Sequence, residues 1–275
     1  MGIKLIQARR VLQKSRIPGA QYVINPYTGC VHGCVYCYAR FMGRFTGHDE
    51  PWGTYLDAKI NAPDVLHSQL AARSAPIDGE IFLSSVTDPY QPPEGQYRLT
   101  RGCLEVLLEA QPRLSILTKS DLVLRDIDLL RQFQHLSVGL SLMTVDDSLT
   151  HILEPRASPP SKRVAALRKL HGAGIRTYAF ISPFIPLLTD IDAIFDAVYG
   201  AVDEIGVEAI NPTGGNWRGV EEALNQLEPG LAARCRQAAR DDMFWQTLEG
   251  HSRGRAARAG MNYMGFFNHP KDKRE

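Results

Sequence analysis

Short, mainly apolar runs alternate along this chain with longer stretches in which apolar residues recur every three or four positions. Residues 80–86 (EIFLSSV) and 136–142 (LSVGLSL) are of the first kind, and residues 100–110 (TRGCLEVLLEA) are of the second. The short apolar runs predict strands that are buried on both faces. The recurrence of apolar residues every three or four positions predicts helices that cover these strands. Strands are expected at residues 22–24, 80–86, 114–118, 136–142, 176–181 and 206–211. Helices are expected at residues 38–45, 62–75, 100–110, 121–133, 161–172 and 190–202.

Strands that alternate with helices predict an α/β fold with a parallel sheet. A partial β/α barrel and a doubly wound open sheet both fit, because periodicity does not separate them. Residues 1–20 are basic and end in Ile17-Pro18-Gly19, so a surface lead-in is expected there. Residues 21–217 are expected to form the core. Residues 218–275 are expected to form a C-terminal helical extension over 219–260, followed by a frayed tail.

Charge is nearly balanced over the 275 residues, with 31 Lys and Arg against 30 Asp and Glu. This balance argues against a global field that would attract nucleic acid or an anionic membrane. One basic patch is nominated in the tail, and only weak, non-specific nucleic-acid binding is expected of it. Its members are Arg253, Arg255, Arg258, Lys271, Lys273 and Arg274.

Apolar stretches are too short for a membrane span. The richest, residues 178–188, is interrupted by Pro183 and Pro186, and a span needs about 20 apolar residues. The start of the chain has charges on both sides of a very short apolar run, unlike a signal peptide. A cytoplasmic protein without a membrane partner is therefore expected.

Three of the five cysteines lie within eight residues, as Cys30, Cys34 and Cys37. The spacing C-x3-C-x2-C suits a cubane iron–sulfur cluster, because one short loop can place three soft ligands on three of its four irons. Zinc would require a fourth protein ligand, for which His32 and His48 are the nearest candidates. Disulfide pairing fits poorly, because three clustered cysteines leave one without a partner.

The wider run from residue 25 to residue 40 reads NPYTGCVHGCVYCYAR. It resembles the signature of the radical SAM superfamily, and in particular the branch that includes spore photoproduct lyase. The resemblance covers about residues 20–215. Further matches lie at residues 87–94 (TDPYQPPE), 118–120 (TKS), 154–157 (EPRA) and 183–186 (PFIP).

This resemblance implies a partial (β/α)6 TIM-like barrel with the site at the carboxyl ends of the strands. It implies a [4Fe–4S] cluster held by the three clustered cysteines, with S-adenosylmethionine on the fourth iron. The expected activity is reductive cleavage of S-adenosylmethionine to a 5′-deoxyadenosyl radical, which abstracts hydrogen from an unidentified substrate. The expected partner is an external one-electron donor of the flavodoxin or ferredoxin type.

Other residues receive roles from the same resemblance. The expected cofactor-binding residues are Tyr36, Thr87, Asp88, Lys119 and Ser141. Lys119 would pair with the methionine carboxylate, and Tyr36 would pack near adenine. Tyr38 and Tyr90 are candidate catalytic residues. Substrate contacts are considered also for Gln91, Glu94 and Asn211. Independently of the resemblance, Glu154 and Arg156 flank Pro155 in a loop and are expected to form a structural ion pair, with a polar wall of the pocket as the alternative.

One departure from the photoproduct lyase pattern affects the expected substrate. That enzyme carries a cysteine hydrogen donor at the end of the second strand, where this chain has Ser84 and Ser85.

Cys103 and Cys235 lie in helical patterns and are expected to be buried free thiols. Two alternatives to an enzyme with a new substrate stay open: a DNA-lesion repair lyase, and a non-catalytic cluster- or metal-binding module.

Overall fold

A computed structural model describes residues 2–213 and 217–268 of the chain. Its main feature is an eight-stranded sheet in the order β11-β10-β9-β8-β7-β6-β3-β2. Every neighbouring pair is parallel except β2 and β3. The strands are β2 (Leu12–Lys14), β3 (Tyr22–Ile24), β6 (Glu80–Leu83), β7 (Arg113–Thr118), β8 (Leu136–Ser141), β9 (Arg176–Phe184), β10 (Glu204–Ala209) and β11 (Asn262–Phe267). All six strands predicted from the sequence are present.

The parallel strands from β3 to β10 follow one another in chain order without a reversal. A doubly wound sheet reverses its strand order at a switch point, so this alternative is wrong. The sheet is also open: in the described part of the chain β2 and β11 are its edges and do not pair with each other. Because these strands are parallel, their carboxyl ends lie at one edge of the sheet.

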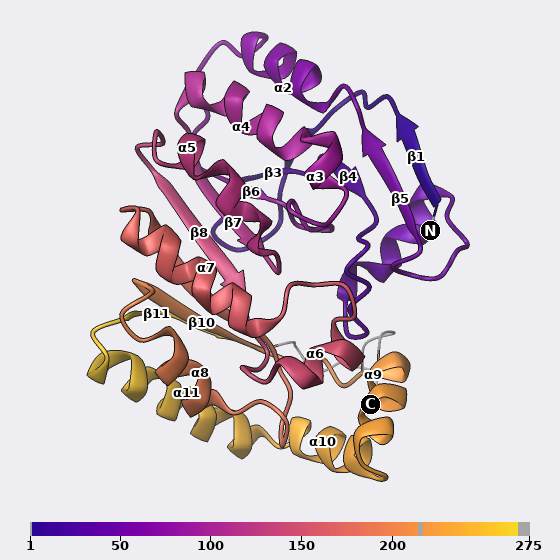
Figure 1. Cartoon of the computed structure of the whole chain (residues 1–275), viewed down its shortest axis with the longest axis vertical. Coiled ribbons are helices and arrows are strands. Elements are labelled where there is room, and N and C mark those ends of the chain that lie inside the picture. Colours follow the sequence, from indigo (N-terminus) through magenta and orange to yellow (C-terminus); the bar gives the residue numbers. More distant parts are fainter. Residues whose placement is uncertain (1, 214–216, 269–275) are drawn as a thin grey trace.

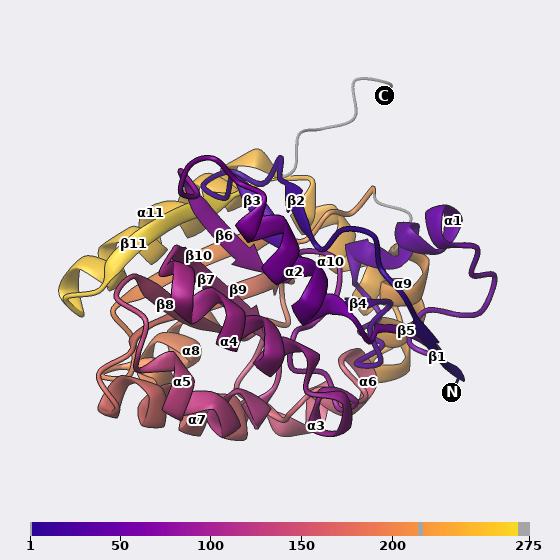
Figure 2. The ribbon, with the colours of Figure 1, turned by 90° about the horizontal axis from the view of Figure 1, so that it is seen from above.

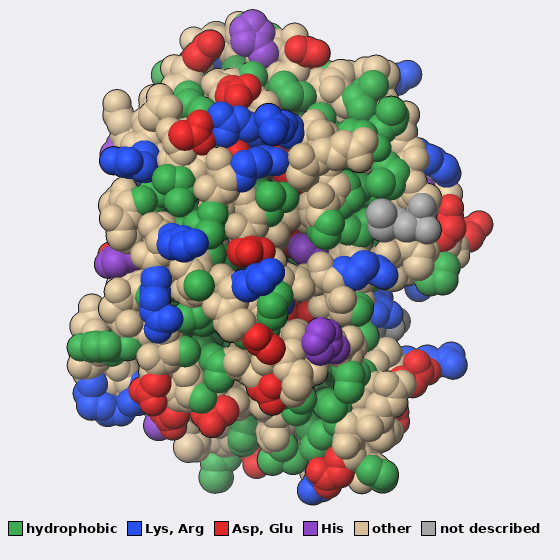
Figure 3. Space-filling model, viewed as in Figure 1, with side chains coloured by type: hydrophobic (Ala, Val, Ile, Leu, Met, Phe, Trp, Pro, Cys, Tyr) green, Lys and Arg blue, Asp and Glu red, His purple; other side chains and the backbone are tan. Residues whose placement is uncertain are grey.

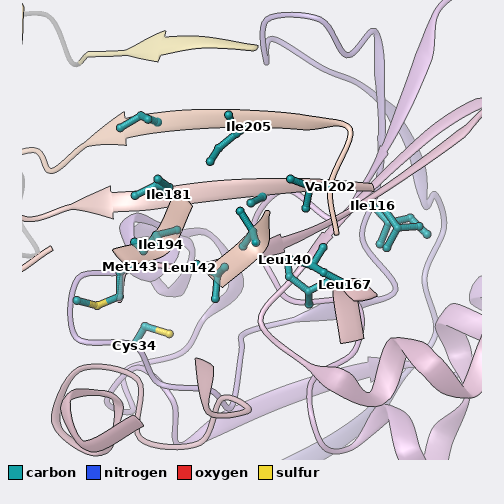
Figure 4. Packing of buried hydrophobic residues seen from close by; sticks show 14 of the residues in the cluster. Cys34, Ile116, Leu140, Leu142, Met143, Leu167, Ile181, Ile194, Val202 and Ile205 are labelled. Carbon is teal, nitrogen blue, oxygen red and sulfur yellow. The ribbon is translucent and has the colours of Figure 1, made fainter. Parts of the chain in front are cut away.

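Helices follow one another along the sheet, from α2 and α4 through α7 to α8 and α11 (Figure 1). The core lies between them and the strands. Ile116, Leu140, Ile181 and Ile205 come from four neighbouring strands and meet Leu167 and Ile194 from the helices (Figure 4). Each such side chain contributes about 1.5–3 kcal/mol when fully buried. These helices are α2 (Ala62–Ala71), α4 (Leu99–Ala110), α7 (Pro160–Gly172), α8 (Ile191–Val198) and α11 (Asp242–Arg258).

The amino-terminal segment forms two strands that the sequence analysis did not predict, although β1 is mostly exposed at the surface. β1 (Gly2–Ile6) pairs in parallel with β5 (Tyr55–Lys59), and β5 pairs with β4 (Tyr27–Thr28) to form a second, small sheet. β2 forms an edge of the large sheet. The partner of β1 lies about 50 residues away, and no local pattern of apolar residues indicates such a pairing.

Two helical predictions change in detail. Residues 121–133 form a 3-10 helix, η2 (Asp121–Asp126), and a single α-helical turn, α5 (Ile127–Leu130). Residues 38–45 form the 3-10 helix η1 (Tyr38–Met42) followed by α1 (Gly43–Thr46). Two short helices were not predicted, α3 (Glu94–Tyr97) and α6 (Asp147–Leu153).

The C-terminal region begins with the expected helices, α9 (Trp217–Leu227), α10 (Leu231–Ala239) and α11. The tail then differs from the frayed end that was expected, because residues 262–267 form β11 beside β10. The Asn262 side chain donates a hydrogen bond of 2.6 Å to Glu204 at the start of this pairing. No helix of the described residues is long and apolar enough to cross a membrane.

Candidate cofactor-binding site

The cysteine loop follows β4 and lies at the carboxyl edge of the large sheet. Cys30 and Cys34 are buried, and Cys37 is half-buried. Gly29 and Gly33 give the loop its turns, with φ of 83° and 66°. A Cβ on Gly29 would lie 2.7 Å from the Tyr55 carbonyl oxygen, so a larger residue would be both strained and crowded there.

The environment of the thiols fits a positively charged metal centre. Burial is the largest cause that raises the pKa of Cys30, Cys34 and Cys37. A buried thiolate needs a compensating positive charge, and metal coordination deprotonates a thiol outright. In residues 2–213 and 217–268, no three His, Cys, Asp or Glu side chains converge as ligands of a single metal ion. A cubane instead takes its thiolates on separate irons, so three cysteines spread along one loop fit it.

Asp88 fastens the cysteine loop to the ends of two strands. Its carboxylate accepts hydrogen bonds from Thr118 Oγ1 at 2.6 Å and from the Lys119 backbone N–H at 2.8 Å. It also accepts from the Tyr90 backbone N–H, and it lies 3.3 Å from His32 Nε2. Burial raises the pKa of Asp88, but His32 and the hydrogen bonds outweigh burial and lower it to about 2. Asp88 is therefore ionised, and both of its oxygens have protein partners.

Thr87 and Gln91 hold the same loop through its backbone. The Thr87 hydroxyl donates to the Gly29 carbonyl oxygen. The Gln91 side chain is fully buried and accepts from the Val31 N–H at 2.9 Å, while its amide donates to Thr87 Oγ1 at 2.9 Å. Gln91 was expected to contact substrate, but the structure places it beneath the cysteine loop.

Arg156 supports the loop from a second side. Its guanidinium donates to the carbonyl oxygens of Val31 and Gly53. Its backbone N–H donates to the His32 carbonyl oxygen at 3.2 Å, and its own carbonyl lies 3.0 Å from His32 Nδ1. The expected ion pair between Glu154 and Arg156 is therefore wrong, because Arg156 is engaged with backbone carbonyls.

Glu154 pairs with Arg163 of α7, and both side chains are fully buried. Glu154 also accepts a hydrogen bond from the Tyr36 hydroxyl. Burial disfavours both charges, but their mutual attraction outweighs it, so the pKa of Glu154 is lowered and that of Arg163 is raised. Arg163 donates to the Ser141 carbonyl oxygen at 2.9 Å, which ties this pair to the end of β8.

Lys119 extends along the carboxyl edge from β7 toward β8. Its Nζ donates to Ser141 Oγ at 2.7 Å and lies 5.6 Å from the centre of the Tyr36 ring. Ser141 Oγ in turn donates to the Ser182 carbonyl oxygen at 3.0 Å. The Ser182 hydroxyl donates to Glu208 of β10. Three of the predicted cofactor-binding residues, Tyr36, Lys119 and Ser141, are thus brought together.

Several residues near this edge were missed by the sequence analysis. Ser182 and Glu208 belong to β9 and β10, and nothing in their local sequence marks them. The sequence analysis considered Ser84 only because photoproduct lyase has a cysteine at the end of the corresponding strand. Its hydroxyl, directly after β6, is buried without a hydrogen-bond partner among the described residues. Such an orphaned hydroxyl is costly, and a bound ligand would relieve the cost.

The remaining predicted residues lie in different environments. Tyr38 is 58% exposed, and its hydroxyl donates to the Ser85 carbonyl oxygen. Tyr90 is fully buried beside Arg125, whose guanidinium lies 6.0 Å from the ring centre. Glu94 is fully buried and pairs with the same arginine at 2.7 Å. Tyr90 and Glu94 therefore pack around Arg125, and their expected roles at the substrate stay predictions.

Asn211 follows β10 at the carboxyl edge, and its side chain accepts hydrogen bonds from Thr213.

Cys103 and Cys235 are buried free thiols on α4 and α10, as predicted. Two members of the nominated basic patch have acidic partners: Arg253 pairs with Glu249, and Arg255 pairs with Asp192 and Asp196. Arg258 is exposed at the end of α11, and Lys271, Lys273 and Arg274 lie outside the described residues.

A family model described as the radical SAM superfamily matches residues 24–196. The chain belongs to the radical SAM superfamily. This radical SAM protein is 43% identical over 189 residues to an uncharacterized protein of Methanocaldococcus jannaschii, a match that covers 69% of this chain and 70% of the relative. It is 28% identical over 174 residues to a protein of Pseudomonas phage M6 named radical SAM Nalpha-GlyT isomerase, covering 62% and 34% of the two chains.

Among solved structures, this radical SAM protein is similar to spore photoproduct lyase complexed with a dinucleoside spore photoproduct. The TM-score is 0.69, and the match covers 96% of this chain and 82% of the lyase chain. Sequence identity is 18%, so this likeness shows the shared fold alone. The expectation of a radical SAM α/β fold is confirmed. Members of this superfamily use a [4Fe–4S] cluster and S-adenosylmethionine, as predicted.

Proposed function

We propose that this radical SAM protein reductively cleaves S-adenosylmethionine and removes a hydrogen atom from an organic substrate. Cys30, Cys34 and Cys37 would hold the cluster. With both groups bound, the site supplies methionine and a 5′-deoxyadenosyl radical from one electron. The observation that carries the proposal is the buried three-cysteine loop, fastened at Asp88 to the strand ends from which Lys119 and Ser141 project.

Lys119 would bind the methionyl carboxylate of S-adenosylmethionine. Its ammonium group is held at the strand edge by a neutral hydroxyl, Ser141 Oγ, and lies near the face of the Tyr36 ring. The Glu154 carboxylate, which attracts Lys119, is already engaged with Arg163 and Tyr36. A ligand carboxylate would therefore add a charge-assisted hydrogen bond to Lys119 and displace only a serine contact.

Thr87 and Asp88 would act as positioning residues, because their side chains hold the loop and the strand ends together. Tyr38, which is exposed and hydrogen-bonded to the residue after Ser84, is the candidate for substrate contact. The hydroxyl of Ser84 would face the bound ligands. We further propose that the open parallel sheet works as a partial barrel, which keeps water from a reactive radical.

The substrate differs, in this proposal, from that of the photoproduct lyase. The strand that ends at Leu83 continues with two serines, so the chain has no thiol at the place where that enzyme carries its hydrogen donor. The phage relative is named an isomerase, which shows that this family includes reactions other than lesion cleavage. We therefore propose that this protein uses the same radical chemistry but does not repair the spore photoproduct.

Lys119→Ala is expected to weaken binding of S-adenosylmethionine about tenfold or more, with the cluster intact. The reason is the loss of a charge-assisted hydrogen bond of about 1.5–3 kcal/mol. Anaerobic equilibrium dialysis measures the affinity, and visible absorbance reports the cluster. Lys162→Ala, an exposed lysine of α7, is the matched control and should bind as the parent does. Equal affinity in the Lys119 variant and the parent would remove Lys119 from the site.

The proposed function is tested by product analysis. Anaerobic protein reduced with dithionite should release 5′-deoxyadenosine and methionine from S-adenosylmethionine. Cys34→Ala protein, treated in the same way, should release neither. Absence of both products from cluster-loaded parent protein would contradict the proposal and favour a non-catalytic cluster-binding module.

A further inference from the structure

Charge is distributed very unevenly along this chain, although its total is nearly neutral. All 30 acidic residues lie after position 48, whereas residues 1–48 contain only basic charges. On the face shown in Figure 3, in contrast, basic and acidic side chains are interspersed. The basic residues of the first segment are Lys4, Arg9, Arg10, Lys14, Arg16, Arg40 and Arg44. Within the described residues, none of them forms an ion pair closer than 4.0 Å.

Exposed aromatic side chains occur in the same segment, directly after Cys37. Phe45 is 76% exposed and Phe41 is 44% exposed. Their ring centres are 6.1 Å apart in an edge-to-face arrangement, so they form one apolar surface. Arg44 is exposed beside them. We call Phe41, Arg44 and Phe45 the η1–α1 patch.

The η1–α1 patch lies where an electron would reach the cysteine loop most directly. Cys37 is the most exposed of the three cysteines, and η1 begins at the next residue. Arg40, within η1, donates to the Cys34 carbonyl oxygen at 3.3 Å and links the helix to the loop. Helix α1 lies at the periphery of the molecule, away from the helices that cover the sheet (Figure 2).

Arg9 and Arg10 add positive charge at the same edge. Leu12 pairs with Ile24 in the antiparallel register of β2 and β3. The residues just before Leu12 therefore lie beyond the carboxyl end of β3, on the side where the cysteine loop begins. Two acidic residues, Asp49 and Glu50, follow α1 along the chain, and Glu50 contacts His48.

We propose that the η1–α1 patch is the docking site of a small acidic one-electron donor protein of the flavodoxin or ferredoxin class. This inference rests on the proposed function, because a radical SAM enzyme needs an external reductant. One electron would leave the reduced prosthetic group of the donor and enter the cluster. The donor is oxidised by one electron, the cluster is reduced by one, and no bond in this chain forms or breaks.

The chemistry of the patch fits this partner. Electron-transfer complexes are small and are guided by complementary charge, with a short apolar contact at the centre. Phe and Arg are also enriched at protein interfaces. Single-stranded nucleic acid would instead require a continuous, positively charged groove with aromatic side chains on which the bases stack. Phe41 and Phe45 lie on a short helical segment at the periphery of the molecule.

The experiment compares two reductants on cluster-loaded protein. Arg44→Glu and Phe45→Ala are expected to slow cluster bleaching by reduced flavodoxin or reduced [2Fe–2S] ferredoxin at least tenfold at low salt. Bleaching by dithionite, which needs no docking surface, should be unchanged. The affinity for each donor, measured by sedimentation, should fall in parallel. Controls are Arg131→Glu and Tyr199→Ala, both exposed and situated before β8 and β10, at the opposite edge of the sheet.

Three results would overturn the docking site: donor-driven bleaching equal to that of the parent, an equal loss with dithionite, or absence of salt-sensitive donor binding by the parent. Tight single-stranded DNA binding that both variants abolish would assign the patch to nucleic acid instead. Failure of the proposed function is distinguishable, because parent protein would then bind the donor and accept its electron without releasing 5′-deoxyadenosine.

Discussion

Cys34→Ala protein is expected to have none of the broad visible absorbance of a [4Fe–4S] cluster after anaerobic reconstitution. Two thiolates on one loop hold a cubane poorly, and Cys34 is the middle ligand of the three. The same loss is expected for Cys30→Ala and Cys37→Ala. Iron and sulfide analysis, together with the absorbance spectrum, measures the outcome.

Cys103→Ala and Cys235→Ala provide matched controls, since both remove a buried thiol from a helix. Their cluster content should equal that of the parent. Full cluster absorbance in Cys34→Ala, or loss of the cluster in either control, would overturn the assignment of ligands.

Arg163→Met is expected to lower the free energy of unfolding by about 3–5 kcal/mol, because it leaves Glu154 as an uncompensated buried charge. Both side chains of this pair are fully buried, and the Tyr36 hydroxyl is a further hydrogen-bond partner of Glu154. Urea unfolding of the cluster-free protein gives the change without a contribution from the cluster.

The matched control removes an arginine from a surface pair. Arg176 lies 2.9 Å from Glu204, but its side chain is 60% exposed. Arg176→Met should therefore cost less than about 1 kcal/mol. A similarly small change for Arg163→Met would show that this buried pair is not important for stability.

The parallel sheet could be predicted because its evidence is local. The parallel strands β3 and β6 to β10 are short apolar runs, most of them followed by a helical pattern, so six of the eight strands of the large sheet are visible in the sequence. The other two, β2 and β11, could not be predicted in this way, and neither could β1 of the small sheet. β1 is mostly exposed, and β11 pairs with a strand that ends more than 50 residues earlier.

The ligand set could be predicted from spacing, but the supports of the cysteine loop could not. Asp88 and Gln91 belong to a motif that resembled a cofactor or substrate contact, yet both are already hydrogen-bonded to backbone and side-chain groups of the loop and strand ends. The partner of Glu154 lies nine residues away, on α7, and not at Arg156 in the same motif. Only the three-dimensional arrangement shows which polar groups are already paired.

Charge illustrates the same limit in a different way. Net charge indicated no preference for a partner, and the tail was nominated as the basic patch. In the structure, two tail arginines are paired with carboxylates, while Arg44 and the arginines before β2 have no such partner among the described residues. The net charge of the whole chain does not show which cationic side chains are paired with carboxylates and which are not.

We propose that three cysteines leave one iron of the cluster open for S-adenosylmethionine. Electron–nuclear double resonance of the reduced cluster tests this coordination, with S-adenosylmethionine labelled with ¹⁵N at its amino group. We expect a ¹⁵N coupling to the cluster that unlabelled cofactor does not give, and that is absent from Cys34→Ala protein. A reduced cluster in the parent protein whose spectrum is unchanged by S-adenosylmethionine would contradict it.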